Sequence, residues 1–325
     1  MSEHIPALEI ENLSYTYTEE WTRKKREALR ALNLTIKAGE AFGFLGPNGS
    51  GKTTTIKAVL GLIRATAGNV RIFGESWTSA RSRAYVGYLP EQPYFYDHLT
   101  VVETLELYAT LAEVPRHERQ RKISETLARV GLSDRRKARM RTLSKGLTQR
   151  AALGQAIISS PKLLILDEPF SGLDPLGRRE FRQIFSELKN EGTTLFMSSH
   201  ILGDVEFLCD RASVLVKGKL QGVFDLHERP TALSGEEFEL TLREEVDAGQ
   251  HLASLAISQE RSGNLQRFRF ADAPSAQRAL TLALEKGFTI ECFERRQTSL
   301  EDIFMKIVAE AGNSGSASQS SSERH

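Results

Sequence analysis

The chain has 325 residues, enough for one large domain with a smaller one or for two medium domains. Its 40% hydrophobic and 26% charged residues are ordinary for a soluble globular protein. A formal net charge of +1 gives no global case for binding nucleic acid or an anionic membrane surface. No apolar run approaches the length of a membrane span, and the N-terminus does not have the pattern of a signal peptide. Cys209 and Cys292 fit a reducing compartment better than a disulfide framework. We therefore expect a cytoplasmic protein whose membrane role comes through a partner.

The first third of the chain reads as strands around a glycine-rich loop. Apolar runs and apolar–polar alternation predict strands over 8–13, 32–36, 41–45, 70–73 and 86–89. The charged stretch 19–27 reads as an exposed loop, and helical spacing of apolar residues predicts a helix over 54–60. The glycine-rich loop lies between a buried strand and this helix.

The middle of the chain alternates between helix and strand. From about 100 to 155 the pattern is helical, which predicts a helical insertion. Strands are then predicted over 162–166, 194–198 and 212–216, with a helix over 175–190. Strands that alternate with helices favour a largely parallel sheet.

Beyond Pro230 the pattern is that of a smaller accessory unit at about 236–310. Its predicted elements are a strand over 238–242, a helix over 248–255, a hairpin of 256–260 and 265–270, a helix over 275–286, a strand over 288–293 and a helix over 300–308. The order β-α-β-β-α-β is that of a ferredoxin-like unit. His251 and Cys292 stand alone, so structural roles are favoured over metal ligation, and dimerisation or regulation is the expected function. Residues 312–325, rich in Ser and Gly, are expected to form a disordered tail.

The glycine-rich loop, Gly46-Pro-Asn-Gly-Ser-Gly-Lys-Thr53, matches the phosphate-loop pattern G-x-x-x-x-G-K-[ST]. Backbone N–H groups of such a loop curl around a phosphate at a helix N-terminus, so a chance glycine-rich turn is disfavoured by the flanking strand and helix. Lys52 can reach the β- and γ-phosphates, and the Thr53 hydroxyl can take a Mg²⁺ position. The expected phosphate-binding residues are Gly46, Pro47, Asn48, Gly49, Ser50, Gly51, Lys52, Thr53 and Thr54.

Two carboxylates, Asp167 and Glu168, end the predicted strand 162–166. Asp167 can hold the Mg²⁺ shell, and Glu168 can orient or activate a water for attack on the γ-phosphate. Alone, the pair would read as a solvated strand end. Behind a phosphate loop, strand-end carboxylates are what Mg²⁺–triphosphate chemistry requires.

Four further motifs accompany these residues in a fixed order along the chain. They are Tyr17, Leu143-Ser-Lys-Gly-Leu147, Ser171-Gly-Leu-Asp174 and Ser198-Ser-His200. Over about residues 6–225, this set resembles the nucleotide-binding subunit of ATP-binding cassette (ABC) transporters. The resemblance implies an α/β P-loop NTPase cassette over 6–230, with a mostly parallel sheet core and a helical subdomain at about 96–158.

The resemblance also implies a role for each matching residue. Tyr17 would stack on adenine, while Ser144 and Gly146 would cap ATP bound by the opposite subunit. Asp174 would form an inter-subunit contact, and His200 would sense the γ-phosphate. The implied catalytic residues are Glu168, His200 and Lys52. The implied protein is an ATP hydrolase that forms an ATP-sandwich dimer with itself or a paralogous cassette and drives an integral membrane permease, without nucleic acid.

The sequence departs from the family pattern at two places. Lys145 and Leu147 replace the first Gly and the Gln of the usual Leu-Ser-Gly-Gly-Gln signature; Lys145 could add positive charge near a phosphate or point to solvent. After the strand 86–89, either Glu91 or Gln92 could take the place of the family's coupling-loop Gln. If Glu91 faces Mg²⁺, its negatively charged carboxylate takes the place of the neutral Gln side chain that the family uses as a ligand. The expected metal ligands are then Thr53, Asp167 and Glu91.

In four features the chain resembles bacterial export-type cassettes, which serve the export of drugs and polysaccharides. These features are the two departures above, the sequence Gly-Phe-Leu-Gly-Pro-Asn-Gly at the loop and the segment 299–304. Export across the cytoplasmic membrane is therefore expected, with the chain bound to the cytoplasmic face through its permease. The alternatives are an importer subunit, a soluble ABC ATPase of translation or DNA maintenance, and a non-catalytic nucleotide-gated module. A single phosphate loop and a short insertion without sustained heptads disfavour the soluble ATPase. Glu168 and His200 disfavour the non-catalytic module.

Overall fold

The computed structural model describes residues 5–18, 23, 25–226, 237–243 and 251–295, together with 301, 304, 305, 307 and 309. The chain divides into two compact units, residues 1–227 and 228–325. Each unit has its own apolar core. Within the described ranges, no helix has both the length and the apolar character needed to cross a bilayer.

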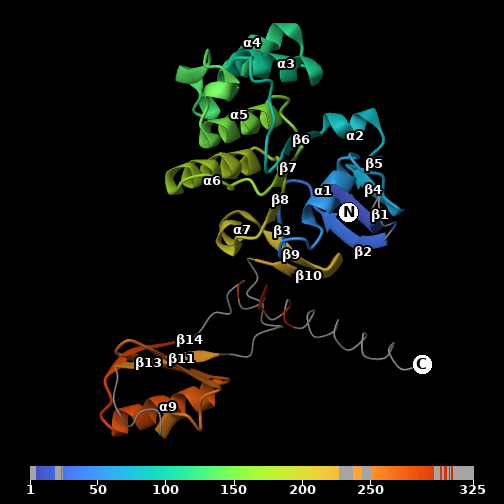
Figure 1. The fold of residues 1–325 in the computed structure, drawn as a ribbon. Helices are drawn as coiled ribbons and strands as arrows, with labels where there is room; N and C mark the ends of the chain where they lie inside the picture. The colour runs from blue at the N-terminus through green and yellow to red at the C-terminus, as the bar shows by residue number, and fades with distance from the viewer. Residues whose placement is uncertain are drawn as a thin grey trace, which may run out of the picture. The chain divides into compact units, whose positions relative to one another are not determined.

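The first unit is built on a six-stranded sheet in the order β10-β9-β3-β8-β7-β6 (Figure 1). The strands are β3 (Ala41–Leu45), β6 (Val86–Leu89), β7 (Leu163–Asp167), β8 (Thr194–Ser199), β9 (Arg211–Val216) and β10 (Lys219–Asp225). All neighbours pair in parallel except β10, which is antiparallel to β9. β3, β7 and β8 are buried along their whole length, and their sequences are accordingly rich in apolar residues, with polar Asp167, Ser198 and Ser199 only at the carboxyl ends of β7 and β8 and Thr194 at the start of β8. The predicted largely parallel sheet is confirmed.

A second sheet, which sequence analysis did not separate from the first, has the order β2-β1-β4-β5 and is antiparallel. Its strands are β1 (Leu8–Thr18), β2 (Lys25–Ile36), β4 (Ala67–Ile72) and β5 (Glu75–Ser76). The exposed loop predicted over 19–27 is wrong at its end, since residues 25–27 begin β2 and pair with 16–18 of β1. Their charged side chains stay exposed while their backbone joins the sheet. The rest of that predicted loop, apart from residue 23, lies outside the described residues.

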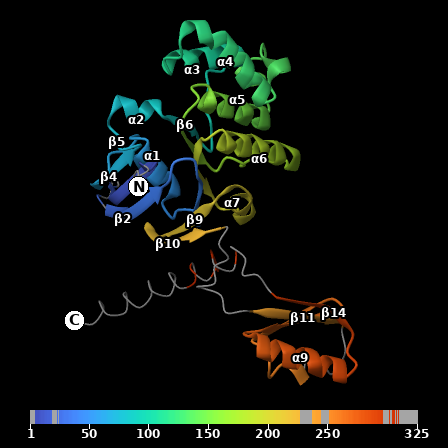
Figure 2. The same ribbon diagram turned by 180° about the vertical axis from the view of Figure 1, so that it is seen from behind.

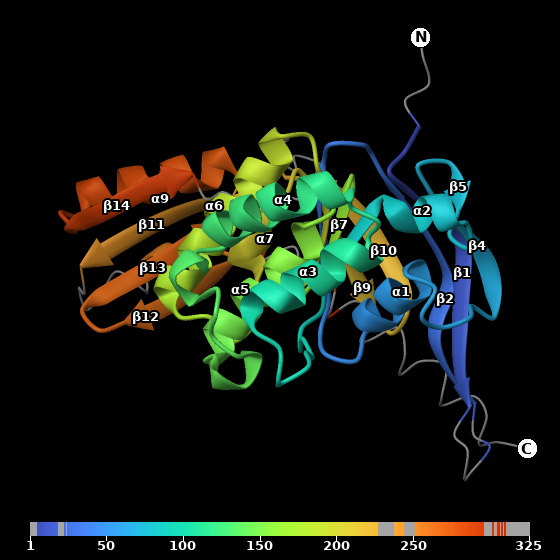
Figure 3. The ribbon, with the colours of Figure 1, turned by 90° about the horizontal axis from the view of Figure 1, so that it is seen from above.

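Four α-helices of the first unit lie in two separate places. α1 (Lys52–Val59) lies between the two sheets, where Ile56 and Val59 join the apolar cluster that contains residues of β1, β3 and β4 (Figures 1 and 3). The predicted helical insertion contains α3 (Val101–Leu111), α4 (Arg116–Arg129) and α5 (Lys145–Ile157), gathered at one end of the unit (Figures 1 and 2). A capping box between Thr100 and Glu103 starts α3.

Three further α-helices and two short 3-10 helices, Ser133–Arg135 and Met140–Thr142, complete the first unit. α6 (Pro175–Asn190) has the predicted bounds, because Asp174 caps its N-terminus, Pro175 occupies the first turn, and Phe181 and Phe185 form a buried stripe. Sequence analysis missed α2 (Ala80–Ala84) and α7 (Leu202–Leu208). Both are too short to show a helical period.

The second unit contains an antiparallel sheet in the order β12-β13-β11-β14. Its elements are β11 (Phe238–Arg243), β12 (Ser258–Ser262), β13 (Leu265–Phe270), α9 (Ala273–Glu285) and β14 (Ile290–Arg295). Small residues of α9, among them Ala276 and Ala279, pack in one cluster with Leu240 and Phe268 of the sheet. The predicted helices 248–255 and 300–308 fall partly outside the described residues, and the predicted tail 312–325 falls wholly outside them.

Candidate active site

The loop that joins β3 to α1 holds its shape through close backbone contacts. Gly51 has a φ of 114°, and a Cβ there would lie 2.9 Å from the carbonyl oxygen of Ala28, so only glycine fits. The Gly218 N–H donates to the Ser50 carbonyl at 2.9 Å. The Ser50 hydroxyl is buried and has no hydrogen-bond partner among the described residues. A buried hydroxyl and the exposed N-terminus of α1 together suit an anion.

Lys52, the first residue of α1, is buried with only 7% of its side chain exposed. Its Nζ donates to the Gly46 carbonyl at 2.7 Å and lies 3.5 Å from Oε1 of Glu168. The ammonium group is therefore held over the loop by one carbonyl and one carboxylate, where it can meet a phosphate.

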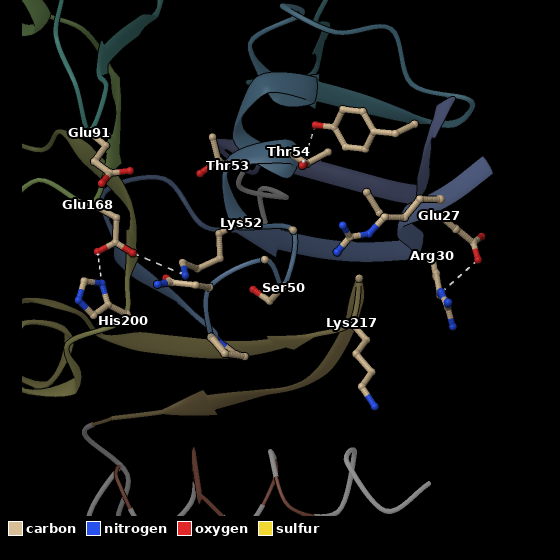
Figure 4. A pocket seen from close by; sticks show the side chains of 18 of the residues that line it. Glu27, Arg30, Ser50, Lys52, Thr53, Thr54, Glu91, Glu168, His200 and Lys217 are labelled. Atoms are coloured by element: carbon tan, nitrogen blue, oxygen red, sulfur yellow. Dashed lines mark hydrogen bonds and ion pairs between the residues drawn. The ribbon is translucent and has the colours of Figure 1, made fainter. Parts of the chain in front are cut away.

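Glu168 lies directly after β7 with a φ of 48°, a left-handed conformation that costs a non-glycine residue roughly 1–3 kcal/mol. Its N–H is fixed by the carbonyl and hydroxyl oxygens of Ser198, at 3.2 and 3.1 Å. The turn directs its carboxylate toward the phosphate loop, where Oε2 lies 2.8 Å from Nδ1 of His200 (Figure 4). One carboxylate therefore joins the loop lysine to the histidine after β8.

Asp167 is the last residue of β7 and is almost fully buried. Its Oδ1 accepts hydrogen bonds from the Ser198 hydroxyl at 2.6 Å and from the Thr53 hydroxyl at 3.4 Å. A hydroxyl and a carboxylate beside a phosphate loop are the oxygen ligands with which proteins hold Mg²⁺ together with substrate phosphates, so this pair fits the ion. Burial, followed by the charges of Asp167 and Glu91, raises the pKa of Tyr88 to about 12.

Lys52, Thr53, Glu168 and His200 line a cavity of about 1050 Å³, whereas Gly46 and the buried Asp167 are not part of its lining. Tyr17 also lines it, with its hydroxyl 3.2 Å from the Thr54 hydroxyl and its ring edge-on to Tyr15. The cavity also has a basic wall formed by Lys25, Arg26 and Lys217, which sequence analysis missed. The basic cluster at the start of β2 was visible in the sequence, but only the pairing of β2 with β1 brings it to the cavity.

The structure brings most of the predicted site residues together, but not all. Glu91 lines the cavity, whereas the exposed Gln92 does not. Ser144 caps α5 and Asp174 caps α6, and neither these two nor Gly146 lines the cavity. Lys145 is exposed, but its side chain does not simply point to solvent. The end of the side chain lies close to Gly172, in the loop of residues 171–174.

Comparison with known proteins agrees with this geometry. Residues 29–171 match the family model described as ABC transporter. The chain is also 39% identical over 299 residues to the ABC transporter ATP-binding protein sll0415 of Synechocystis sp., an alignment that covers 90% of this chain and 81% of that protein. The chain belongs to the ABC transporter ATP-binding proteins. It is therefore an ATP-binding and ATP-hydrolysing subunit of a transporter, with the P-loop cassette fold.

Two further relatives bear on how such an ATPase works. The bacitracin transport ATP-binding protein BcrA of Bacillus licheniformis is 34% identical over 284 residues, which cover 85% of this chain and 91% of that protein. The ATP-binding cassette MJ0796, solved as a dimer in a post-hydrolysis state with ADP and Pi bound, has a TM-score of 0.63 and 25% identity. The match covers 68% of this ABC ATPase and 99% of that chain.

Proposed function

We propose that this ABC ATPase energises a separately encoded membrane permease and that the transporter exports its substrate. The likeness to a bacitracin transport ATP-binding protein extends over most of both chains, which supports a substrate of the peptide-antibiotic class. The export-type resemblance of the phosphate loop and of residues 299–304 supports the direction. The chain then lies on the cytoplasmic face of the membrane, bound to its permease.

The observation that carries the catalytic assignment is the contact of one carboxylate, Glu168, with both Lys52 and His200. In the proposed reaction Glu168 accepts a proton from the attacking water, whose oxygen bonds to the γ-phosphorus as the bond to the ADP oxygen breaks. Lys52 neutralises the phosphate oxygens, and His200 holds the carboxylate in place and contacts the γ-phosphate. Mg²⁺, held by Thr53 and Asp167 with Glu91 nearby, supplies further positive charge when it is bound.

The same arrangement supports an ATP-sandwich dimer, with itself or with a paralogous cassette. Ser144 and Gly146 carry the signature positions, yet neither lines the cavity of its own chain. A second chain that presents these residues to the phosphates would complete each site. Asp174 would contribute the contact between subunits, and Tyr17 would stack on adenine within its own chain.

For the C-terminal unit, at about 236–310, we propose a ferredoxin-like fold with a role in dimerisation or regulation. The four antiparallel strands and α9 support that topology. The cassette itself is proposed to span 6–230, with its helical subdomain at about 96–158. Within the described residues, no group of three or more His, Cys, Asp or Glu could hold a metal ion, in either unit.

The partner is tested by affinity purification of the tagged full-length chain from native membranes, with E168Q alongside to retain bound ATP. A multispanning membrane protein recovered in stoichiometric amount supports the permease. Recovery of ribosomal or DNA-associated proteins instead would contradict it and favour the ATPase of translation or DNA maintenance.

The direction is tested separately in inverted membrane vesicles that contain the chain and its permease, with bacitracin as the probe. ATP-dependent accumulation of bacitracin inside these vesicles corresponds to export from the cell, and E168Q should abolish it. Loss of bacitracin from preloaded vesicles would instead indicate import, and no movement in either direction would reject this substrate class.

A further inference from the structure

Arg182, in the middle of α6, joins this helix to α7 through a buried carboxylate. Its Nε and Nη2 donate to Oδ1 of Asp204 at 3.1 and 2.5 Å. Asp204 has no exposed surface, and its other oxygen, Oδ2, has no hydrogen-bond partner among the described residues. The guanidinium group also lies 5.1 Å from the ring centroid of Phe207, one turn further along α7. Two side chains of α7, those of Asp204 and Phe207, therefore contact the same arginine of α6.

The helix held in this way begins two residues after His200. α7 has only seven residues, too few for a helix that is stable by itself, so its position depends on contacts with the rest of the unit. One contact is the packing of Val205 on Gly43 of β3, where a Cβ on the glycine would lie 2.3 Å from the valine. A second is the pair between Arg182 and Asp204, and a third is the hydrogen bond that Nζ of Lys189, also on α6, donates to the Leu208 carbonyl at 3.4 Å.

The segment that carries His200 is fixed at both ends. On one side β8 is held in the sheet between β3 and β7. On the other side, the Ile201 N–H donates to the Ser199 hydroxyl at 2.9 Å, and the first turn of α7 follows with Asp204 in it. His200 itself is largely exposed, and in the site its Nδ1 lies 2.8 Å from Oε2 of Glu168. Its direction therefore depends on where α7 begins.

We propose that Arg182 is a positioning residue for ATP hydrolysis: by holding Asp204 it fixes the start of α7 and thereby keeps His200 against Glu168. This inference rests on the proposed role of His200. Among the described residues, Arg182 is the only cation in an ion pair with Asp204, so no other charge replaces it. Because Asp174 of the 171–174 loop caps α6, the same arginine also links that loop to the histidine through this helix.

The test compares three variants of the full-length chain in steady-state ATP hydrolysis. R182M removes the charge and keeps the aliphatic stem, R182K keeps the charge, and R179M makes the same exchange at an exposed position of the same helix. R182M should lower kcat roughly tenfold to a hundredfold with little change in the KM for ATP, since small misplacements of a catalytic group cost factors of this size. R182K should recover part of the loss, and R179M should match the wild type.

A double-mutant cycle with H200A separates positioning of the histidine from a general effect on the fold. If Arg182 acts through His200, R182M has no further effect on kcat once His200 is absent. An equal, additive loss in the H200A background overturns the inference, as does an R182M variant with wild-type kcat. H200A with unchanged kcat would instead reject the proposed role of His200 itself.

Folding is controlled by a second variant that avoids a lone buried charge. R182M leaves the Asp204 carboxylate unpaired, which can destabilise the chain by itself. R182M/D204N removes both charges while the amide keeps the carboxylate's shape. If R182M does not fold, this double variant should show the same loss of kcat at unchanged KM; wild-type kcat in a folded R182M/D204N overturns the inference.

Discussion

The central strands of the six-stranded sheet in the first unit are covered on both faces, whereas the sheet of the second unit has α9 on one face and charged side chains on the other. β3, β7 and β8 expose no residue along their length. In the second unit, β13 alternates buried Gln266, Phe268 and Phe270 with more exposed arginines. These arginines pair with acidic neighbours: Arg267 with Glu239, and Arg269 with Glu239 and Glu260.

This difference decides where each unit can place reactive groups. A sheet covered on both faces leaves only the strand ends open, and in parallel sheets ligands bind beyond the carboxyl ends. Glu168 and His200 follow two neighbouring strands, β7 and β8, and therefore meet. In the second unit the charges lie along a sheet face and neutralise one another, an arrangement that stabilises a surface and offers little to a substrate.

The largest expected effect is on catalysis in the first unit. Glu168→Gln removes the proposed base while keeping its shape, so kcat should fall roughly 10²–10⁴-fold. The Kd for ATP should change little, because Lys52 and the loop backbone remain. Steady-state hydrolysis and calorimetric titration with ATP measure the two quantities.

The matched control is Glu27→Gln. Glu27 also lines the cavity, but it is exposed and pairs with Arg30 away from β7. Its kcat should stay near the wild-type value. Equal losses in both variants, or an undiminished kcat in E168Q, would show that the strand-end carboxylate is not the base.

The independence of the two units is tested next, through their cores. Phe268 is fully buried in the second unit, so Phe268→Ala should lower the unfolding free energy of that unit by about 3–5 kcal/mol. ATP binding by the first unit should persist. Differential scanning calorimetry with and without ATP checks both expectations.

The corresponding variant in the first unit is Phe196→Ala, which opens a cavity in the core beneath β8. This change should lower the midpoint temperature of the unfolding transition that ATP stabilises. A loss of ATP binding in F268A, or a single transition that both variants shift equally, would mean that the two cores fold as one.

Sequence patterns predicted those elements whose signals are local. β3 matches its predicted bounds and β8 extends its own by one residue, because buried strands read as unbroken apolar runs. α6 was predicted with its observed bounds, because the cap Asp174, the proline after it and a clear helical period all agree. The phosphate loop and the carboxylates of Asp167 and Glu168 were found for the same reason: each is a short motif next to a strong strand signal.

Pairings between distant segments could not be read in this way. The division into two sheets depends on which strands join, and β1 pairs not only with β2, the next strand along the chain, but also with the distant β4. The link from Arg182 to Asp204 spans 22 residues and has no sequence pattern. Counting residues also left Glu91 and Gln92 as alternatives, since only the folded chain shows that Glu91 lines the cavity and Gln92 does not.

A smaller effect, on the Mg²⁺ dependence of hydrolysis, is expected from exchanging Glu91 or Gln92 in the loop after β6. Glu91 lines the cavity beside Glu168, so Glu91→Gln should raise the Mg²⁺ concentration for half-maximal hydrolysis about tenfold, a typical cost of losing a carboxylate near a bound metal. Gln92→Ala should leave it unchanged, because Gln92 is exposed outside the cavity. Magnesium titrations of ATPase activity decide the matter, and the opposite ranking would assign the coupling-loop role to Gln92.

The smallest expected effect is on the thiol reactivity of the two cysteines, of which each unit contains one. Cys209 is buried after α7, and Cys292 is exposed on β14. Burial, with the charge of Asp210 added to it, raises the pKa of the Cys209 thiol above its usual range. The reactive thiolate is therefore scarce at pH 8, and Cys209 should react with a disulfide reagent only after unfolding, while Cys292 reacts in the native protein. C292S should consequently show no fast thiol and C209S should show one; a fast thiol in C292S would mean that α7 opens readily from β3, against the close packing of Val205 on Gly43.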